Sequence, residues 1–350
     1  MPYRCLLVLV LAALLLLSGC STVEFYRQAV VGQSRLLIAR QNTSDLVQSG
    51  ATDSALRERI LFVNEVLAFA SQLGLHHNGS YKSYVETGQR YIIWNVFAAD
   101  PYGLVLKQSC FPVAGCVSYR GYFRQQHAHR EAERLAGLGF EVYVAGVTAY
   151  STLGWFDDPL LDTFLFQPDD QLAALVFHEL AHQLVYVAGD TRFSESLATS
   201  IERYALGQWF ADQGNNQALD DWQQARNRRD AVLTLIDSTR RSLAVIYEAE
   251  ITADAMDLAK SSVIKDLRMR YELLAVHWKE QGVLKPPFRH WMETDINNAK
   301  LETVADYNAW VPGLNLLADK YGFEQFVSRL KILAEMAVVE RTEALTLLQP

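Results

Sequence analysis

The sequence predicts an α+β fold, in which a small mixed or antiparallel sheet lies over one long helix and a large helical region follows. Two observations lead to this prediction. Between residues 75 and 148, β-branched and aromatic residues form short runs separated by glycines and prolines, a pattern typical of short strands. Between Gly214 and Gly282 the chain has neither glycine nor proline, so we expect two or three long helices there, with a helical hairpin favoured.

The N-terminal segment has the features of a bacterial lipoprotein signal. Arg4 precedes an unbroken apolar run, Leu6 to Leu17, that as a helix would be about 18 Å long, too short to cross a bilayer. Leu17-Ser18-Gly19-Cys20 resembles a lipobox, in which the cysteine carries the lipid; an ordinary signal peptide with an incidental cysteine is the alternative. Because Ser21 is not the aspartate associated with inner-membrane retention, we predict an outer-membrane lipoprotein facing the periplasm.

The remaining cysteines fit such an oxidising compartment. Cys5 would leave with the signal and Cys20 would be lipidated, so only Cys110 and Cys116 are left. They flank a short stretch with turn residues, which predicts a small-loop disulfide, with two free buried thiols as the alternative.

Apolar periodicity and helix-breaking residues divide the chain into four segments. We predict a signal peptide over 1–19, an N-terminal helical segment over 20–75, a core over 76–213 and a C-terminal helical region over 214–350 packed on that core. The expected helices are 26–39, 54–73, 123–138, 168–189, about 190–210, 296–307 and 314–333, and the clearest strand is 141–148. The net charge of −8, with acidic and basic residues interspersed, gives no sign of a nucleic-acid partner.

The strongest chemical signal lies in the predicted helix 168–189. His178, Glu179 and His182 form an H-E-x-x-H motif, and residues four apart on a helix share one face. Both imidazoles can therefore bind one metal ion, while Glu179 can accept a proton from the attacking water. The alternative is a helix whose two histidines bind nothing. With the sheet expected above this helix, the motif predicts a zincin-like metallopeptidase core and one zinc ion as its cofactor.

A catalytic zinc site needs a third protein ligand, and the next predicted helix offers it. Ser194 to Thr199 resembles the stretch that carries the third ligand in gluzincin metallopeptidases, which indicates Glu195. Because the intervening turn is short, the second helix must fold back, and Glu195 then lies near the level of His182. Glu202 is the alternative ligand or a partner that orients a histidine, and Asp190 in the turn is a further alternative, better suited to capping the helix.

Two other roles are less well defined by the sequence. For a donor to the developing oxyanion, Tyr307, Tyr150 and His290 are candidates, although no spacing singles one out. For the peptide substrate, the edge of strand 143–148 and the following loop precede the motif helix, where an extended peptide could add to the sheet. Glycines there, Gly146 among them, would permit close approach of a backbone, but ordinary turn glycines explain them equally well.

Several stretches together resemble a bacterial family described as putative aminopeptidases. They are the lipoprotein-like start, Trp94–Ala99, Cys110–Val117, Tyr150–Leu160, His178–Glu195, Asn297–Ala299 and Tyr307–Pro312. The resemblance covers nearly the whole mature chain and implies a zincin-type zinc peptidase. By position, its zinc ligands are His178, His182 and Glu195, and its acid/base is Glu179.

The chain departs from the large gluzincin aminopeptidase family in two respects. It has no Gly-x-Met-Glu-Asn motif, which holds the free amine of the substrate in that family, and Thr199 replaces an acid that some gluzincins place behind a histidine ligand. We therefore expect a lipid-anchored zinc peptidase, with the aminopeptidase assignment resting on the resemblance. The alternatives are a non-catalytic periplasmic scaffold or binding module, and a zinc hydrolase of non-peptide substrates.

Overall fold

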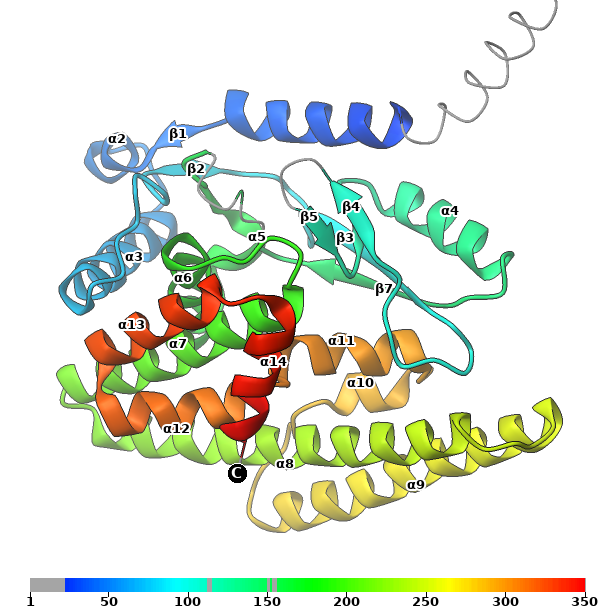
Figure 1. Cartoon of the computed structure of the whole chain (residues 1–350). Helices are drawn as coiled ribbons and strands as arrows, with labels where there is room; N and C mark the ends of the chain where they lie inside the picture. The colour runs from blue at the N-terminus through cyan, green and yellow to red at the C-terminus, as the bar shows by residue number, and fades with distance from the viewer. Residues whose placement is uncertain (1–22, 112–114, 150–151, 153–155, 350) are drawn as a thin grey trace, which may run out of the picture.

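The computed structural model describes residues 23–111, 115–149, 152 and 156–349. The fold is α+β, with helices predominating over three small sheets (Figure 1). Cys20 and Tyr150 lie outside the described residues. The strands are β1 (Gln41–Asn42), β2 (Ser83–Val85), β3 (Ile93–Ala99), β4 (Ser109–Phe111), β5 (Gly115–Val117), β6 (Arg120–Tyr122), β7 (Glu141–Val147) and β8 (Leu160–Leu161).

The helices occupy both ends of the chain and most of its C-terminal half. An N-terminal helix over residues 23–38 runs across one side of the molecule (Figure 1). The others are α2 (Thr43–Gln48), α3 (Ser54–Leu73), α4 (Gln125–Ala136), α5 (Asp162–Leu165), α6 (Asp169–Leu184), α7 (Thr191–Asp212), α8 (Asn216–Tyr247), α9 (Ala253–Glu280), α10 (Arg289–Glu293), α11 (Asn298–Asn308), α12 (Val311–Tyr321), α13 (Phe323–Glu335) and α14 (Val338–Leu347).

The central sheet has the order β6-β3-β7, and β3 pairs antiparallel with both neighbours. Because side chains alternate along a strand, β3 contributes to two separate clusters. Val96 and Ala98 pack with α4 on one face, while Phe97 and Ala99 pack towards α11 on the other. Asn95 shares the face of Phe97, so it points away from α4 and towards the side on which the motif helix lies.

The two smaller sheets are short. In the first, β2 pairs antiparallel with β1 and parallel with β8. The second is the β4–β5 hairpin, in which a disulfide joins Cys110 to Cys116. This cross-link lies at the predicted place and holds the two hairpin strands together.

The motif helix α6 lies at the centre of the largest hydrophobic core. Leu172, Val176 and Leu180 are fully buried, and α6 packs against α7 and α3. The C-terminal helices α12, α13 and α14 close the same core, to which they contribute Leu314, Phe326 and Leu345 among others. Apolar burial of this extent makes α6 a rigid base for its polar residues.

The expected helical hairpin is present as α8 and α9, which pack along each other. Their apolar stripes, including Leu235, Leu243 and Leu267, form a second core together with residues of α10 and α11. Within the described residues, no helix is both long and apolar enough to span a membrane.

Two expectations about helix ends were wrong. Helix α6 begins at Asp169 without a side-chain cap and ends at Leu184 rather than near Gly189. The helix expected over 314–333 is split into α12 and α13 at Gly322, whose φ of 70° breaks the helix. A further helix, α14, follows and was not expected.

Candidate metal centre

Two histidines of α6 and one glutamate of α7 converge on one point. The Nε2 atoms of His178 and His182 lie 3.3 Å and 3.6 Å from the same carboxylate oxygen, Oε2 of Glu195. One ligand atom from each residue lies within 4.8 Å of the others, so the group can hold a metal ion. Two imidazole nitrogens and one carboxylate oxygen are the donor set of many catalytic zinc sites, which keep a further position for water.

The turn between α6 and α7 explains why Glu195 reaches the histidines. Asp190 caps α7 by accepting a hydrogen bond from the backbone N–H of Phe193 at 3.0 Å. The buried guanidinium of Arg341, on α14, lies 2.8 Å from the other carboxylate oxygen of Asp190. Asp190, the alternative ligand considered from the sequence, is therefore committed to the turn, and the structure does not bring it to the metal-binding group.

Glu202 lies behind His178. Its Oε2 atom is 3.0 Å from Nδ1 of His178, the ring nitrogen that faces away from Glu195. A carboxylate in this place fixes both the tautomer and the ring orientation of a metal-binding histidine. Thr199 does not take this role, because its hydroxyl donates to the backbone carbonyl of Tyr307 and so ties α7 to α11.

Burial and nearby charges shift the pKa values of these groups. Burial alone would lower the pKa of His178, but its hydrogen bonds with Glu195 and Glu202 outweigh this and raise the pKa well above its ordinary value. Burial opposes ionisation of Glu195, yet the charges and hydrogen bonds of His182 and His178 hold its pKa at about 2. Glu195 is therefore a carboxylate, the form that binds a cation.

Glu179 is set apart from the three ligand candidates. Burial raises the pKa of its carboxyl group, and this effect exceeds the opposing influence of His182 and His178. A carboxylate with a raised pKa is a better proton acceptor near neutral pH than an ordinary one. Its surroundings include Tyr81, a buried residue with a backbone φ of 67° that the sequence did not single out.

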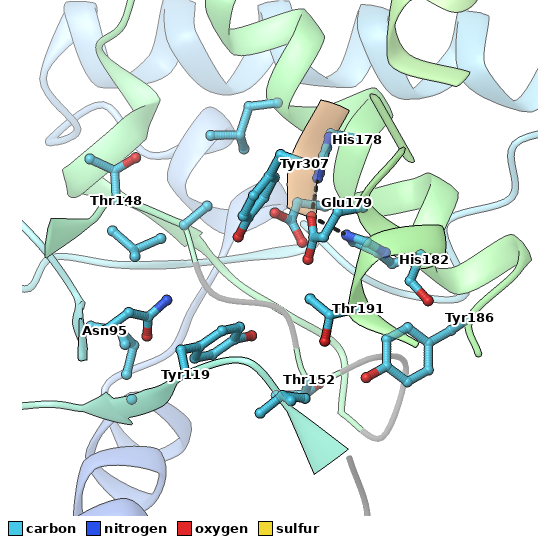
Figure 2. A pocket seen from close by; sticks show the side chains of 18 of the residues that line it. Asn95, Tyr119, Thr148, Thr152, His178, Glu179, His182, Tyr186, Thr191 and Tyr307 are labelled. Carbon is cyan, nitrogen blue, oxygen red and sulfur yellow. Dashed lines mark ion pairs between the residues drawn. The ribbon is translucent and has the colours of Figure 1, made fainter. Parts of the chain in front are cut away.

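The group opens into a cavity of about 930 Å³. Figure 2 shows His178, Glu179 and His182 on one side of it, with the hydroxyl of Tyr307 extending into the cavity beside them. Tyr307, a candidate oxyanion donor, is thus placed in the cavity wall. His290 lies exposed on α10 and is not among the described residues that line the cavity.

The other walls come from distant parts of the chain. The N-terminal helix contributes Phe25 and Gln33, while β3 contributes Ile93 and Asn95. The end of β7 and the residues after it, Val147 to Ala149, complete the wall next to the motif helix. The strand that was expected to meet the substrate therefore reaches the cavity only at its C-terminal end.

Gly146 and Asp158, in and after the strand that leads to the cavity, have structural roles. Gly146 lies under the ring of Tyr91, and a Cβ atom there would come within 2.4 Å of that ring, so its close approach is to a side chain and not to a substrate. The buried carboxylate of Asp158 accepts hydrogen bonds from the backbone N–H and the hydroxyl of Thr152. Asp158 therefore organises the loop.

Among the cavity residues, the sequence analysis did not single out Asn95, Gln33 or Thr191. The only signal for Asn95 is a polar residue within an otherwise apolar strand, Trp94 to Ala99. Gln33 lies in a helix whose position over the cavity is a tertiary feature, and Thr191 is the first residue of α7. Nothing in the spacing of these residues indicates that they line one cavity.

The comparisons with known proteins point to one family. A family model described as "Putative aminopeptidase" matches residues 24–345. The chain belongs to this putative aminopeptidase family. No curated protein and no solved structure matches the chain. Family membership supports a peptidase, and the matched region contains every described residue of the metal-binding group and its cavity.

Proposed function

We propose that the protein is a zinc-dependent peptidase built on a zincin-like core. The observation that carries this proposal is the convergence of His178, His182 and Glu195 at the edge of a large cavity, with Glu179 beside them. This donor set fits zinc better than magnesium or calcium, which favour oxygen ligands alone. Membership in the putative aminopeptidase family supports a peptide as the substrate.

The residues around the group suit hydrolysis of an amide bond. A zinc ion bound there would polarise the scissile carbonyl and lower the pKa of the attacking water. Glu179 accepts the proton of this water and passes it to the leaving amine, a role that its raised pKa favours. The hydroxyl of Tyr307 can donate a hydrogen bond to the developing oxyanion. Glu202 keeps His178 in the orientation that its ligand role requires.

The charges in the cavity favour the amino end of a peptide. The charged side chains among its described lining residues are acidic, Glu179, Glu195 and Glu202, and no lysine or arginine is found there. A zinc ion bound there would offset two of these three negative charges, so a small excess of negative charge remains to attract a free ammonium group, and no lysine or arginine among these residues would bind a terminal carboxylate. This distribution supports an aminopeptidase rather than a carboxypeptidase.

We further propose that the enzyme is a lipoprotein of the outer membrane, facing the periplasm. The support is the apolar run Leu6–Leu17, the lipobox-like Leu17–Cys20 and the Cys110–Cys116 disulfide, a cross-link typical of oxidising compartments. The lipid would anchor the chain close to the N-terminal helix that lines the cavity.

Metal analysis combined with a Glu179→Gln variant tests the proposed function. We expect purified wild-type protein to hold about one zinc ion per chain and to cleave members of a broad peptide library. The variant should keep the metal and lose at least about 100-fold in kcat, because general acid–base catalysis contributes at least this much. Protein without stoichiometric metal, or a variant as active as the wild type, would contradict the proposal.

The same library separates the remaining alternatives. Zinc-loaded protein that cleaves no peptide would favour a binding module or a hydrolase of other substrates. For active enzyme, one peptide is compared with a free and with an acetylated amino terminus. Equal cleavage of both forms would rule out an aminopeptidase and leave an endopeptidase.

A further inference from the structure

Asn95 is a buried polar side chain in the wall of the cavity. It is 6% exposed, and its Oδ1 atom has no hydrogen-bond partner among the described residues. Figure 2 shows Asn95 across the cavity from His178 and Glu179. The Oδ1 atom is enclosed next to Gly121 of β6, whereas Figure 2 shows the amide nitrogen on the side of the cavity, so this N–H group can donate a hydrogen bond to an occupant.

The backbone of Asn95 is held in place by strands on both sides. It is the third residue of the central strand β3, where it pairs with Gly121 of β6 and Ala145 of β7. Hydrogen bonds of two neighbouring strands hold its backbone, so the side chain cannot withdraw from the cavity by a loop movement. Groups placed on such rigid elements bind ligands with defined geometry.

The surroundings of Asn95 are uncharged. Ile93 of β3, Val147 of β7 and Phe123, the residue after β6, line the cavity near Asn95. The wall thus offers one neutral hydrogen-bonding group within a largely apolar surface, a composition common in specificity pockets.

We propose that Asn95 binds a backbone amide of the substrate and that the wall around it forms a subsite for an uncharged, apolar residue. This inference rests on the proposed peptidase function and adds the substrate class. The amide nitrogen of Asn95 can donate a hydrogen bond to the carbonyl oxygen of a peptide group of the substrate. A charged residue in this subsite would lose its hydration without gaining an opposite charge.

Binding to a catalytically silent protein tests the subsite directly. The background is Glu179→Gln with zinc bound, and the probe is a tetrapeptide amide of alanine, leucine and phenylalanine with a free amino terminus. Its affinity is measured by calorimetry for this background, for the background carrying Asn95→Leu, and for the background carrying Asn64→Leu as a matched control. Asn64 is exposed on α3 and does not line the cavity.

We expect Asn95→Leu to weaken binding about 3- to 10-fold, the loss of one hydrogen bond, and Asn64→Leu to change it less than twofold. Probes in which each peptide carbonyl in turn is converted to a thioamide, a weaker hydrogen-bond acceptor, should identify one position that weakens binding to the background protein but has no further effect in the Asn95→Leu protein. Replacing one residue of the probe by lysine or glutamate should weaken binding at least 10-fold. Thermal unfolding with and without zinc verifies that each variant folds and holds the metal.

The outcomes separate the subsite from the enzyme activity. Equal affinity of the Asn95→Leu protein and its background, or no binding of the probe to the background, overturns the subsite. If wild-type protein cleaves peptides while Asn95→Leu leaves kcat/KM unchanged, the peptidase stands and the subsite fails. If zinc-loaded wild type cleaves nothing while binding still depends on Asn95, the subsite stands and the proposed function fails.

Discussion

Replacing Glu202 by glutamine should weaken zinc binding without removing a ligand. The carboxylate of Glu202 lies 3.0 Å from Nδ1 of His178. His182 lacks a comparable support, since its buried Nδ1 atom has no hydrogen-bond partner among the described residues. Among the described residues, a carboxylate behind the ring therefore orients His178 but not His182.

The expected loss of zinc affinity follows from the contact between Glu202 and His178. A hydrogen bond to a charged group contributes about 1.5–3 kcal/mol, which corresponds to roughly 10- to 100-fold in affinity. The side chain of Glu202 is 28% exposed, so solvent screens its charge, and glutamine retains a carbonyl acceptor for His178. We therefore expect the lower end, about 10-fold weaker zinc binding, for Glu202→Gln.

Competition with a chromogenic chelator measures the zinc affinity of the wild type and of each variant. Glu250→Gln is a matched control, because it makes the same change of charge at an exposed position outside the cavity. Glu195→Gln removes a ligand candidate and should cost more than 100-fold. An unchanged affinity for Glu202→Gln would refute the positioning role, and a loss equal to that of Glu195→Gln would make Glu202 a ligand itself.

Two further predictions concern stability. Arg341→Met should lower the free energy of unfolding by about 3–5 kcal/mol in urea titrations, because it leaves the carboxylate of Asp190 without its buried partner; a loss below 1 kcal/mol would contradict this. For Lys300, burial lowers the pKa to about 8 from an ordinary 10.5, so the unfolded chain binds more protons between these pH values. The stability of the wild type relative to Lys300→Met should therefore rise from pH 8 to pH 10.5, and a constant or falling difference would show that the pKa is not lowered.

The sequence by itself determined the features that depend on neighbouring residues. The spacing of His178 and His182 places both on one helix face because the helical repeat is a local property. The tract between Gly214 and Gly282 could be recognised as a hairpin of long helices for the same reason. Gly322 does not by itself reveal the end of α12, because glycine occurs inside helices as well as after them.

The tertiary structure determines which residues each of these elements contacts. Asp190 precedes α7 while Glu195 and Glu202 lie within it, and only the packing of α7 on α6 gives these three acids different roles. Asn95 is one polar residue in an apolar strand until β3 is placed between β6 and β7, which turns it towards the cavity. Local periodicity specifies which face of an element is apolar, whereas the partner of that face depends on contacts between residues far apart in the chain, which no short-range pattern encodes.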